Sequence, residues 1–215
     1  MSFFVIELQK DALDQSISTT NLLRKALVVA KKLKLADFEK WINVELNGYY
    51  GTDNDIPKYR NVSGQLKGWN PYHGWLPTIL NTDNNTEKLL TNRDVGDPLS
   101  EIEFLMRGES SELVMIYPAN LEDILGKMFN SRTKYQLFVS KSQFQGILEE
   151  VRTTILKWSL ELECDGILGD EMIFSEKEKE IAVTKNYTVN NFYGEVKNSQ
   201  IQQHTMESGQ NKFSS

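Results

Sequence analysis

A carboxylate on an apolar helical stripe is the residue of this chain with the clearest chemical potential. Glu45 interrupts a run of apolar side chains that recur at three- and four-residue steps, which is the spacing of one helix face. A charge on such a face is costly unless an opposite charge pairs with it. The candidate partners in the same segment are Arg24, Lys25 and Arg60. The sequence therefore predicts an ion pair at Glu45 and leaves its cation open.

This predicted pair has two interpretations. In the structural one, a buried ion pair fixes the angle between two helices and the loop that follows them. In the functional one, the pair forms the charged floor of a pocket, and Trp41, Tyr49 and Tyr59 are its walls. Aromatic walls with a few convergent polar groups are usual for small-molecule sites and suit a planar ligand. We favour the structural interpretation.

Several familiar catalytic signatures are missing from the sequence. It contains no Gly-rich phosphate loop of the common types, no HExxH and no GxSxG. The two histidines, His73 and His204, lie far along the chain from the lone Cys164. A zinc site or a Cys-His nucleophile would have few residues to draw on. We therefore expect no metal, no cofactor and, on balance, no enzymatic activity.

Charge and composition limit the partners of this chain. With 24 basic and 30 acidic residues, its formal charge is −6, which argues against binding nucleic acid over the whole surface. The basic run from Arg24 to Lys34 is interpreted as a solvated helix face, with phosphate contacts as the alternative. The single cysteine excludes an intrachain disulfide, and no apolar run approaches the roughly 18 residues of a membrane span. We expect a cytoplasmic protein without membrane contact.

The elements that must position Glu45 are predominantly helical. We predict an α+β fold, with a mainly helical N-terminal domain and a few short strands. Between residues 60 and 91, one or two short strands and an ordered loop are expected to pack against the helices, and residues 81–86 are expected to form a surface turn. Helices are predicted at 3–15, 21–33, 38–47, 99–106, 119–129 and 144–162, and a strand at 113–117. Residues 134–140 are expected to form either a strand or the run-in to the helix that follows.

Polar residues mark the predicted helix starts. One of residues 18–20 is expected to cap the second helix, and Ser100 the helix at 99–106. Ser140 with Gln143, and Ser175 with Glu178, have the spacing of capping boxes, in which two side chains satisfy each other's backbone amides.

The chain divides into three predicted parts. Residues 1–164 form the helical-rich domain, 165–186 an acidic linker with a short helix, and 187–215 a β-prone or disordered tail. The tail alternates apolar and polar residues and is rich in Asn and Gln, yet it has too little apolar surface to fold alone. We favour strands that order by pairing between subunits, which predicts a homo-oligomer held by the tail.

Several sequence blocks resemble one bacterial family. The blocks are LLRKAL at 22–27, F-x-x-W-I-N-x-ELNGY at 38–49, P-x-YR at 57–60 and V-R-x-x-I-L-x-W-x-L-x-L-E at 151–163. Together they resemble the AbiTii family of abortive-infection proteins. The tail phrase NNFYGEV, followed by SQIQQ, resembles C-terminal segments attached to several bacterial defence and regulatory proteins.

The family resemblance implies a role in defence against bacteriophage, in which an infected cell stops growing or dies before phage release. It brings no established catalytic residues. The polar positions inside the matching blocks are the candidates for any site: Arg24, Glu45, Asn47, Tyr49, Tyr59 and Arg60.

Three functional hypotheses follow. The first is an antiphage protein that acts through binding and self-association. The second is a sensor or sequestering protein for a nucleotide-type small molecule. The third is a toxin enzyme, such as a nuclease, without a recognisable motif.

Overall fold

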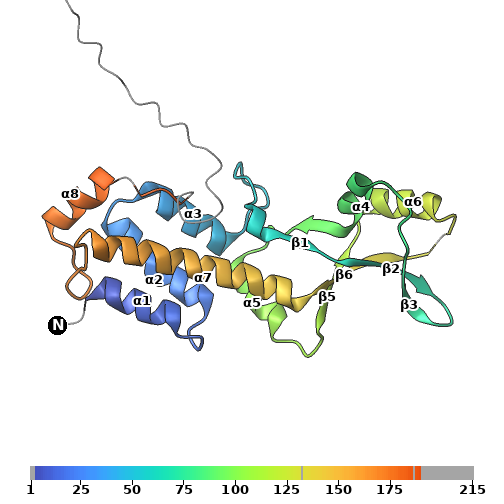
Figure 1. The fold of residues 1–215 in the computed structure, drawn as a ribbon, viewed down its shortest axis with the longest axis horizontal. Helices are drawn as coiled ribbons and strands as arrows, with labels where there is room; N and C mark the ends of the chain where they lie inside the picture. Colours follow the sequence, from blue (N-terminus) through green and yellow to red (C-terminus); the bar gives the residue numbers. More distant parts are fainter. Residues whose placement is uncertain (1–2, 132, 186, 190–215) are drawn as a thin grey trace, which may run out of the picture.

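The computed structural model describes residues 3–131, 133–185 and 187–189, and it has a helical end and a sheet end (Figure 1). The helical end contains α1 (Phe4–Leu13), α2 (Thr19–Lys32), α3 (Ala36–Asn47), the long α7 (Lys141–Cys164) and α8 (Glu176–Lys185), with α5 (Leu99–Met106) beside it. The short 3-10 helix η1 (Lys58–Arg60) leads towards the sheet end. The α+β fold expected from the sequence is confirmed.

The sheet end consists of two small antiparallel sheets and two short helices. The larger sheet has the order β3-β2-β6-β5, and the smaller pairs β1 with β4. Its elements are β1 (Asn61–Ser63), β2 (Gln65–Asn70), β3 (Gly74–Pro77), α4 (Asn84–Thr91), β4 (Asn92–Asp94), β5 (Glu112–Ile116), α6 (Ala119–Met128) and β6 (Tyr135–Ser140). Among the described residues, no helix is both long and apolar enough to cross a membrane.

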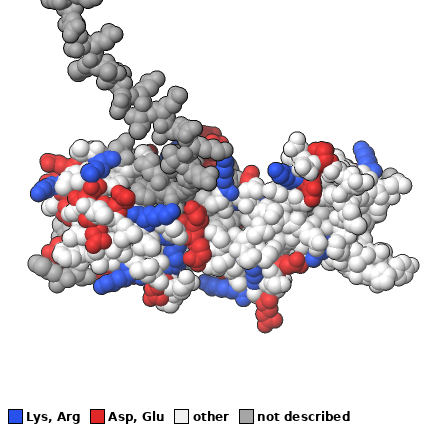
Figure 2. Space-filling view, viewed as in Figure 1, with Lys and Arg blue, Asp and Glu red and all other residues white. Residues whose placement is uncertain are grey.

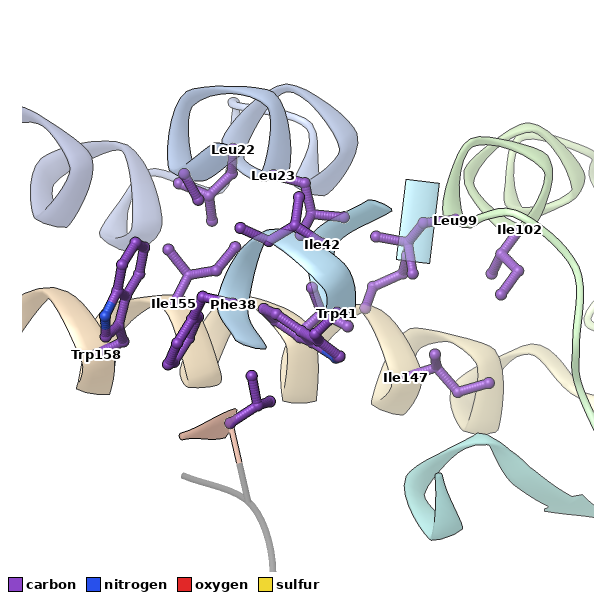
Figure 3. Close-up of a cluster of buried hydrophobic side chains, with 14 of the residues drawn as sticks. Leu22, Leu23, Phe38, Trp41, Ile42, Leu99, Ile102, Ile147, Ile155 and Trp158 are labelled. Atoms are coloured by element: carbon purple, nitrogen blue, oxygen red, sulfur yellow. The ribbon is translucent and has the colours of Figure 1, made fainter. Parts of the chain in front are cut away.

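The helical end forms because the predicted apolar stripes face one another. Phe38 on α3 stacks on Trp158 of α7 with 4.3 Å between ring centroids, and Trp41 meets Phe38 edge to face. Leu22 and Leu23 of α2 lie against the same cluster (Figure 3). Burying these apolar surfaces supplies most of the stability that a helix lacks on its own. Trp158 is fully buried in this core and Trp41 is 7% exposed.

The predicted helix caps are only partly confirmed. Ser18 caps α2 by accepting from the Asn21 amide, and Ser175 with Glu178 forms the capping box before α8. The residue before α5 is Pro98 and not Ser100, and it makes no capping hydrogen bond because proline has no polar side-chain atom.

The predicted capping box at α7 does not form. Ser140 does cap this helix, but it accepts from the Ser142 amide. The Gln143 side chain bonds instead to the backbone of Ser63 on β1, accepting from its amide at 2.8 Å and donating to its carbonyl. At Ser63 the Gln143 side chain bonds to both a backbone amide and a backbone carbonyl, whereas in a capping box it would bond to one amide.

The region from 60 to 91 differs from its prediction. It contains three strands rather than one or two, and β2 and β3 form a hairpin that pairs with β6 instead of packing against the main helices (Figure 1). Of the expected surface turn at 81–86, residues 84–86 are the start of α4, which Asp83 caps by accepting from the amides of Asn85 and Thr86. Asp83 was the signal for this helix.

Residues 165–185 pack on the helical end. Ile167, Phe174 and Ala182 belong to the buried core, and α8 is present where a short helix was expected. Glu178 accepts from the amides of Leu168 and Gly169, whose carbonyls accept from the first amides of α1. The proposed division into domains stays a prediction, and most of the predicted tail lies outside the described residues.

Candidate functional site

Glu45 pairs with Arg60, and both side chains are completely buried. Arg60 Nη2 lies 2.5 Å from Glu45 Oε2, and Nε lies 3.3 Å from Oε1, so the guanidinium meets the carboxylate with two donors. Arg60 Nη1 donates to the carbonyls of Val95 and Asp97, each at 2.9 Å. The predicted ion pair exists, and its partner is Arg60.

Two tyrosines complete the network around Glu45. The hydroxyl of Tyr49 donates to Glu45 Oε1 at 2.5 Å, and the hydroxyl of Tyr59 donates to the same oxygen. Trp41 Nε1 in turn donates to the Tyr59 hydroxyl at 3.2 Å. The Arg60 guanidinium also lies over the Tyr49 ring, 4.8 Å from its centroid. A buried carboxylate with this many donors has its desolvation cost offset.

The pKa values of Tyr49 and Arg60 are both raised in this network, so both groups keep their protons. Burial raises the pKa of Tyr49, and the Glu45 carboxylate raises it further. Burial would lower the pKa of Arg60, but the charge of Glu45 and its hydrogen bond, together with Tyr49 and Tyr59, outweigh burial and raise that pKa above its ordinary value. Tyr49 therefore stays a neutral donor and Arg60 stays charged at physiological pH. Neither is poised to exchange a proton with a substrate.

The backbone after α3 delivers these side chains. Gly48 ends the helix with φ of +91°, which only glycine adopts easily. A Cβ at Gly48 would lie 3.0 Å from the Gly96 carbonyl oxygen, so the close approach also requires glycine. The Tyr49 amide donates to that same oxygen at 2.7 Å. This tertiary contact, together with the positive φ, explains why the helix ends at a glycine.

A cavity of about 700 Å³ lies directly over the buried network. Trp41, Tyr49 and Tyr59 are among its walls, whereas Glu45 and Arg60 are not part of the lining. Three carboxylates and two amines also line it, so its charged groups carry both signs. These are Asp37, Asp55, Glu150, Lys40 and Lys58. The pair is thus a brace beneath a pocket, and the pocket has aromatic walls.

The structure separates the seven candidate residues into three groups. Trp41, Tyr49 and Tyr59 reach the cavity, and Glu45 and Arg60 lie beneath it; this arrangement combines parts of both interpretations. Arg24 and Asn47 lie elsewhere, for different reasons. The exposed Arg24 donates to Asn21 on its own helix, and the exposed Asn47 donates to the Asn43 carbonyl. They bond locally and do not join the network.

Sequence reasoning missed several residues that line the cavity. Asp37, Lys40, Trp41 and Val44 follow each other at helical spacing on α3, so this second stripe could have been found from periodicity. Glu150 lies on α7, and no pattern in the surrounding sequence predicts that it lines the cavity. The basic run from Arg24 to Lys34 lies at the surface and does not reach the cavity. Lys25 bonds to Glu7 and Asp11, and other members lie exposed.

Comparison with known proteins gives one family and no close relative. Neither the curated proteins nor the solved structures gave a match to this chain. A family model does match, over residues 4–187, which include both ends of the molecule and every residue of the Glu45 network. The resemblance in the helical blocks is therefore confirmed: the chain belongs to the AbiTii family.

Proposed function

We propose that this protein takes part in abortive infection through binding and self-association, without a chemical step of its own. Membership of the AbiTii family supports the antiphage role. One observation carries the binding part: an aromatic-walled cavity lies over a sealed polar network. Glu45 and Arg60 are fully buried and satisfied by other protein groups, so they shape the pocket floor without reaching its contents.

The cavity suits a planar small molecule. Its volume falls within the range of about 300–1,000 Å³ that is common for ligand sites. A base stacked on the partly exposed Tyr59 would gain contact area at little entropic cost, because the hydrogen bond to Glu45 already holds this ring, while the buried Trp41 and Tyr49 contribute little exposed surface to the wall. The second candidate function, a sensor or sequestering protein for a nucleotide signal, rests on this surface.

The charges around the cavity limit how many phosphates such a ligand carries. Lys40 and Lys58 can each meet a phosphate oxygen, but Asp37, Asp55 and Glu150 repel it. With carboxylates in the majority, a polyphosphate is disfavoured. The lining therefore suits a nucleotide of low charge, such as a cyclic nucleotide, better than a nucleoside triphosphate.

Calorimetry tests the nucleotide hypothesis. The full chain is titrated with cyclic and ADP-ribose-type nucleotides, alongside Lys58→Gln in the cavity and Lys32→Gln on the exposed end of α2 as the matched control. We expect Lys58→Gln to weaken binding about tenfold and Lys32→Gln to leave it unchanged. If no nucleotide gives heat, or if both variants behave alike, the cavity does not serve this function.

Self-association through the tail has its own test. Removing residues 190–215 leaves the described core intact, because that core ends at Val189. We expect the truncated chain to have a lower mass by light scattering and to lose protection in a phage plating assay. An unchanged mass would exclude the tail as the oligomerisation segment.

A further inference from the structure

We propose that one face of the four-stranded sheet binds a second copy of this chain. The surface, called the open face below, consists of Trp69, Trp75, Val114, Ile116 and Phe138. It lies within the described residues and does not involve residues 190–215. It is therefore a second contact, separate from the oligomerisation assigned to the tail.

Strand pairing places these five residues on one side of the sheet. In an antiparallel pair, directly opposite residues point to the same face. Val114 is opposite Phe138, Ile116 is opposite Gln136, and Trp69 is opposite Trp75. Aromatic rings connect the Trp69–Trp75 pair to Phe138. The ring centroid of Trp75 lies 5.5 Å from that of Phe138 and 5.4 Å from that of Trp69. The row of apolar side chains thus crosses the whole sheet.

The two faces of this sheet differ in burial: one is covered by other parts of the chain, and the other is exposed to solvent. Tyr135, Leu137 and Val139 alternate with the open-face positions of β6 and are buried. On that side Phe129, the residue directly after α6, has its ring 5.6 Å from that of Tyr135, and α4 adds the buried Leu90. On the open face, by contrast, Ile116 is 74% exposed, Val114 47% and Trp69 43%. Contiguous apolar exposure of this kind marks interaction sites.

The charge of the open face favours a second copy as its occupant. Its charged strand residues, Lys67 and Glu112, neutralise each other at 3.0 Å, and Lys67 also lies over the Phe138 ring. The whole chain carries −6, whereas the strand positions of the open face carry no net charge. In the view of Figure 2, charged side chains are denser over the helical end than over the sheet end. Two copies that each carry −6 repel less when they meet through a face without net charge than through a charged one.

The shape of the molecule permits this contact. The sheet lies at the end opposite the main helices, so two copies can pack sheet on sheet with their helical ends apart (Figure 1). Four strands about 4.8 Å apart and about 17 Å long present roughly 300 Å² of flat area. This is below the roughly 800 Å² per partner of standard interfaces. The contact is therefore weak alone and adds to the tail by raising avidity.

The experiment compares two lysine substitutions in the full chain. Ile116→Lys places a charge on the open face, and Leu89→Lys places one on α4, outside that face; the two side chains are 74% and 73% exposed. Both variants should fold, because neither residue contributes to the core. Sedimentation velocity over a range of protein concentrations then gives the mean mass of each, with Val114→Glu as a second open-face variant.

We expect the mean mass of the natural chain to rise with concentration. Ile116→Lys and Val114→Glu should shift that rise to concentrations at least about tenfold higher, because a charge would be desolvated at the contact. Leu89→Lys should follow the natural chain. The inference falls if all four curves coincide, or if the mass does not depend on concentration. Tail deletion lowers the mass at every concentration, so the two contacts are distinguishable.

Discussion

Trp158 at the helical end and Trp75 at the sheet end both sit in ring contacts, yet only Trp158 is fully buried. Trp158 stacks on Phe38 between helices that arrive from distant parts of the chain. Trp75 leans on Phe138 across a sheet and remains partly in solvent. A tryptophan enclosed on all sides serves packing, whereas one held at an accessible surface remains able to contact something else.

The ion pairs repeat the contrast. Glu45 and Arg60 are both 0% exposed, with two tyrosine hydroxyls and two carbonyls completing the network. Lys67 and Glu112 also pair, but their side chains are 16% and 41% exposed. The first pair braces a pocket and the second only cancels charge on an open face. In this molecule, burial distinguishes a charged pair that determines architecture from one that adjusts a surface.

The largest expected effect separates the two tryptophans. Trp158→Ala would leave a cavity in the core and should lower the free energy of unfolding by about 3–5 kcal/mol. Trp75→Ala should lower it by about 1 kcal/mol, since mainly ring contacts are lost. Denaturant unfolding of dilute protein measures both. Equal losses would contradict the difference in burial.

The ion pairs give the next prediction. Arg60→Met would leave Glu45 charged and buried without its cation, which should cost about 3–5 kcal/mol. Lys67→Met, at the partly exposed pair, should cost about 0–1 kcal/mol. Thermal and denaturant unfolding provide the comparison. A small loss for Arg60→Met would mean that the Glu45 network is not a brace.

The smallest effect is pH-dependent and concerns residues 165–185, which include α8. Burial would raise the pKa of Glu178, but hydrogen bonds from Gly169, Ser175 and Leu168 outweigh it and lower that pKa. A lowered folded-state pKa means that the stabilisation is complete above the ordinary glutamate value. It is lost as the pH falls through the lowered one.

We therefore expect amides in 165–185 to exchange faster in acid, after correction for intrinsic rates, while α2 stays protected. In Glu178→Gln this pH dependence should be weaker at Leu168 and Gly169, while the part that comes from Asp165, whose pKa Lys185 and Tyr187 lower, should remain. If the natural chain and the variant respond alike to acid, Glu178 does not hold the segment.

Much of the helical end was predictable because its helices are amphipathic. The apolar stripes around Leu22, Phe38 and Trp158 announced α2, α3 and α7 within a few residues of their ends. Ser18 and the Ser175–Glu178 box acted within one turn of the chain, so local spacing was sufficient. The α4 helix was missed, because its stripe is short and its cap, Asp83, was interpreted as part of a turn.

Contacts between distant segments could not be predicted in this way. Gln143 had the spacing of a cap but found Ser63, 80 residues away. Arg152 appeared to be one residue in an amphipathic helix, yet its buried guanidinium bonds to carbonyls at the end of α1, including those of Asp11 and Ala12. Such pairings depend on which helix ends come together, which sequence spacing does not encode.

The sequence by itself determined that Glu45 needs a cation, because a charge on an apolar stripe cannot stay unpaired in a core. It also determined the family and the helices that carry the pair. Only the tertiary structure decided that Arg60 supplies the charge and that Arg24 does not, because η1 carries Arg60 under α3 while Arg24 faces solvent. It likewise decided which sheet face stays open, since that depends on where α4 and α6 fold back.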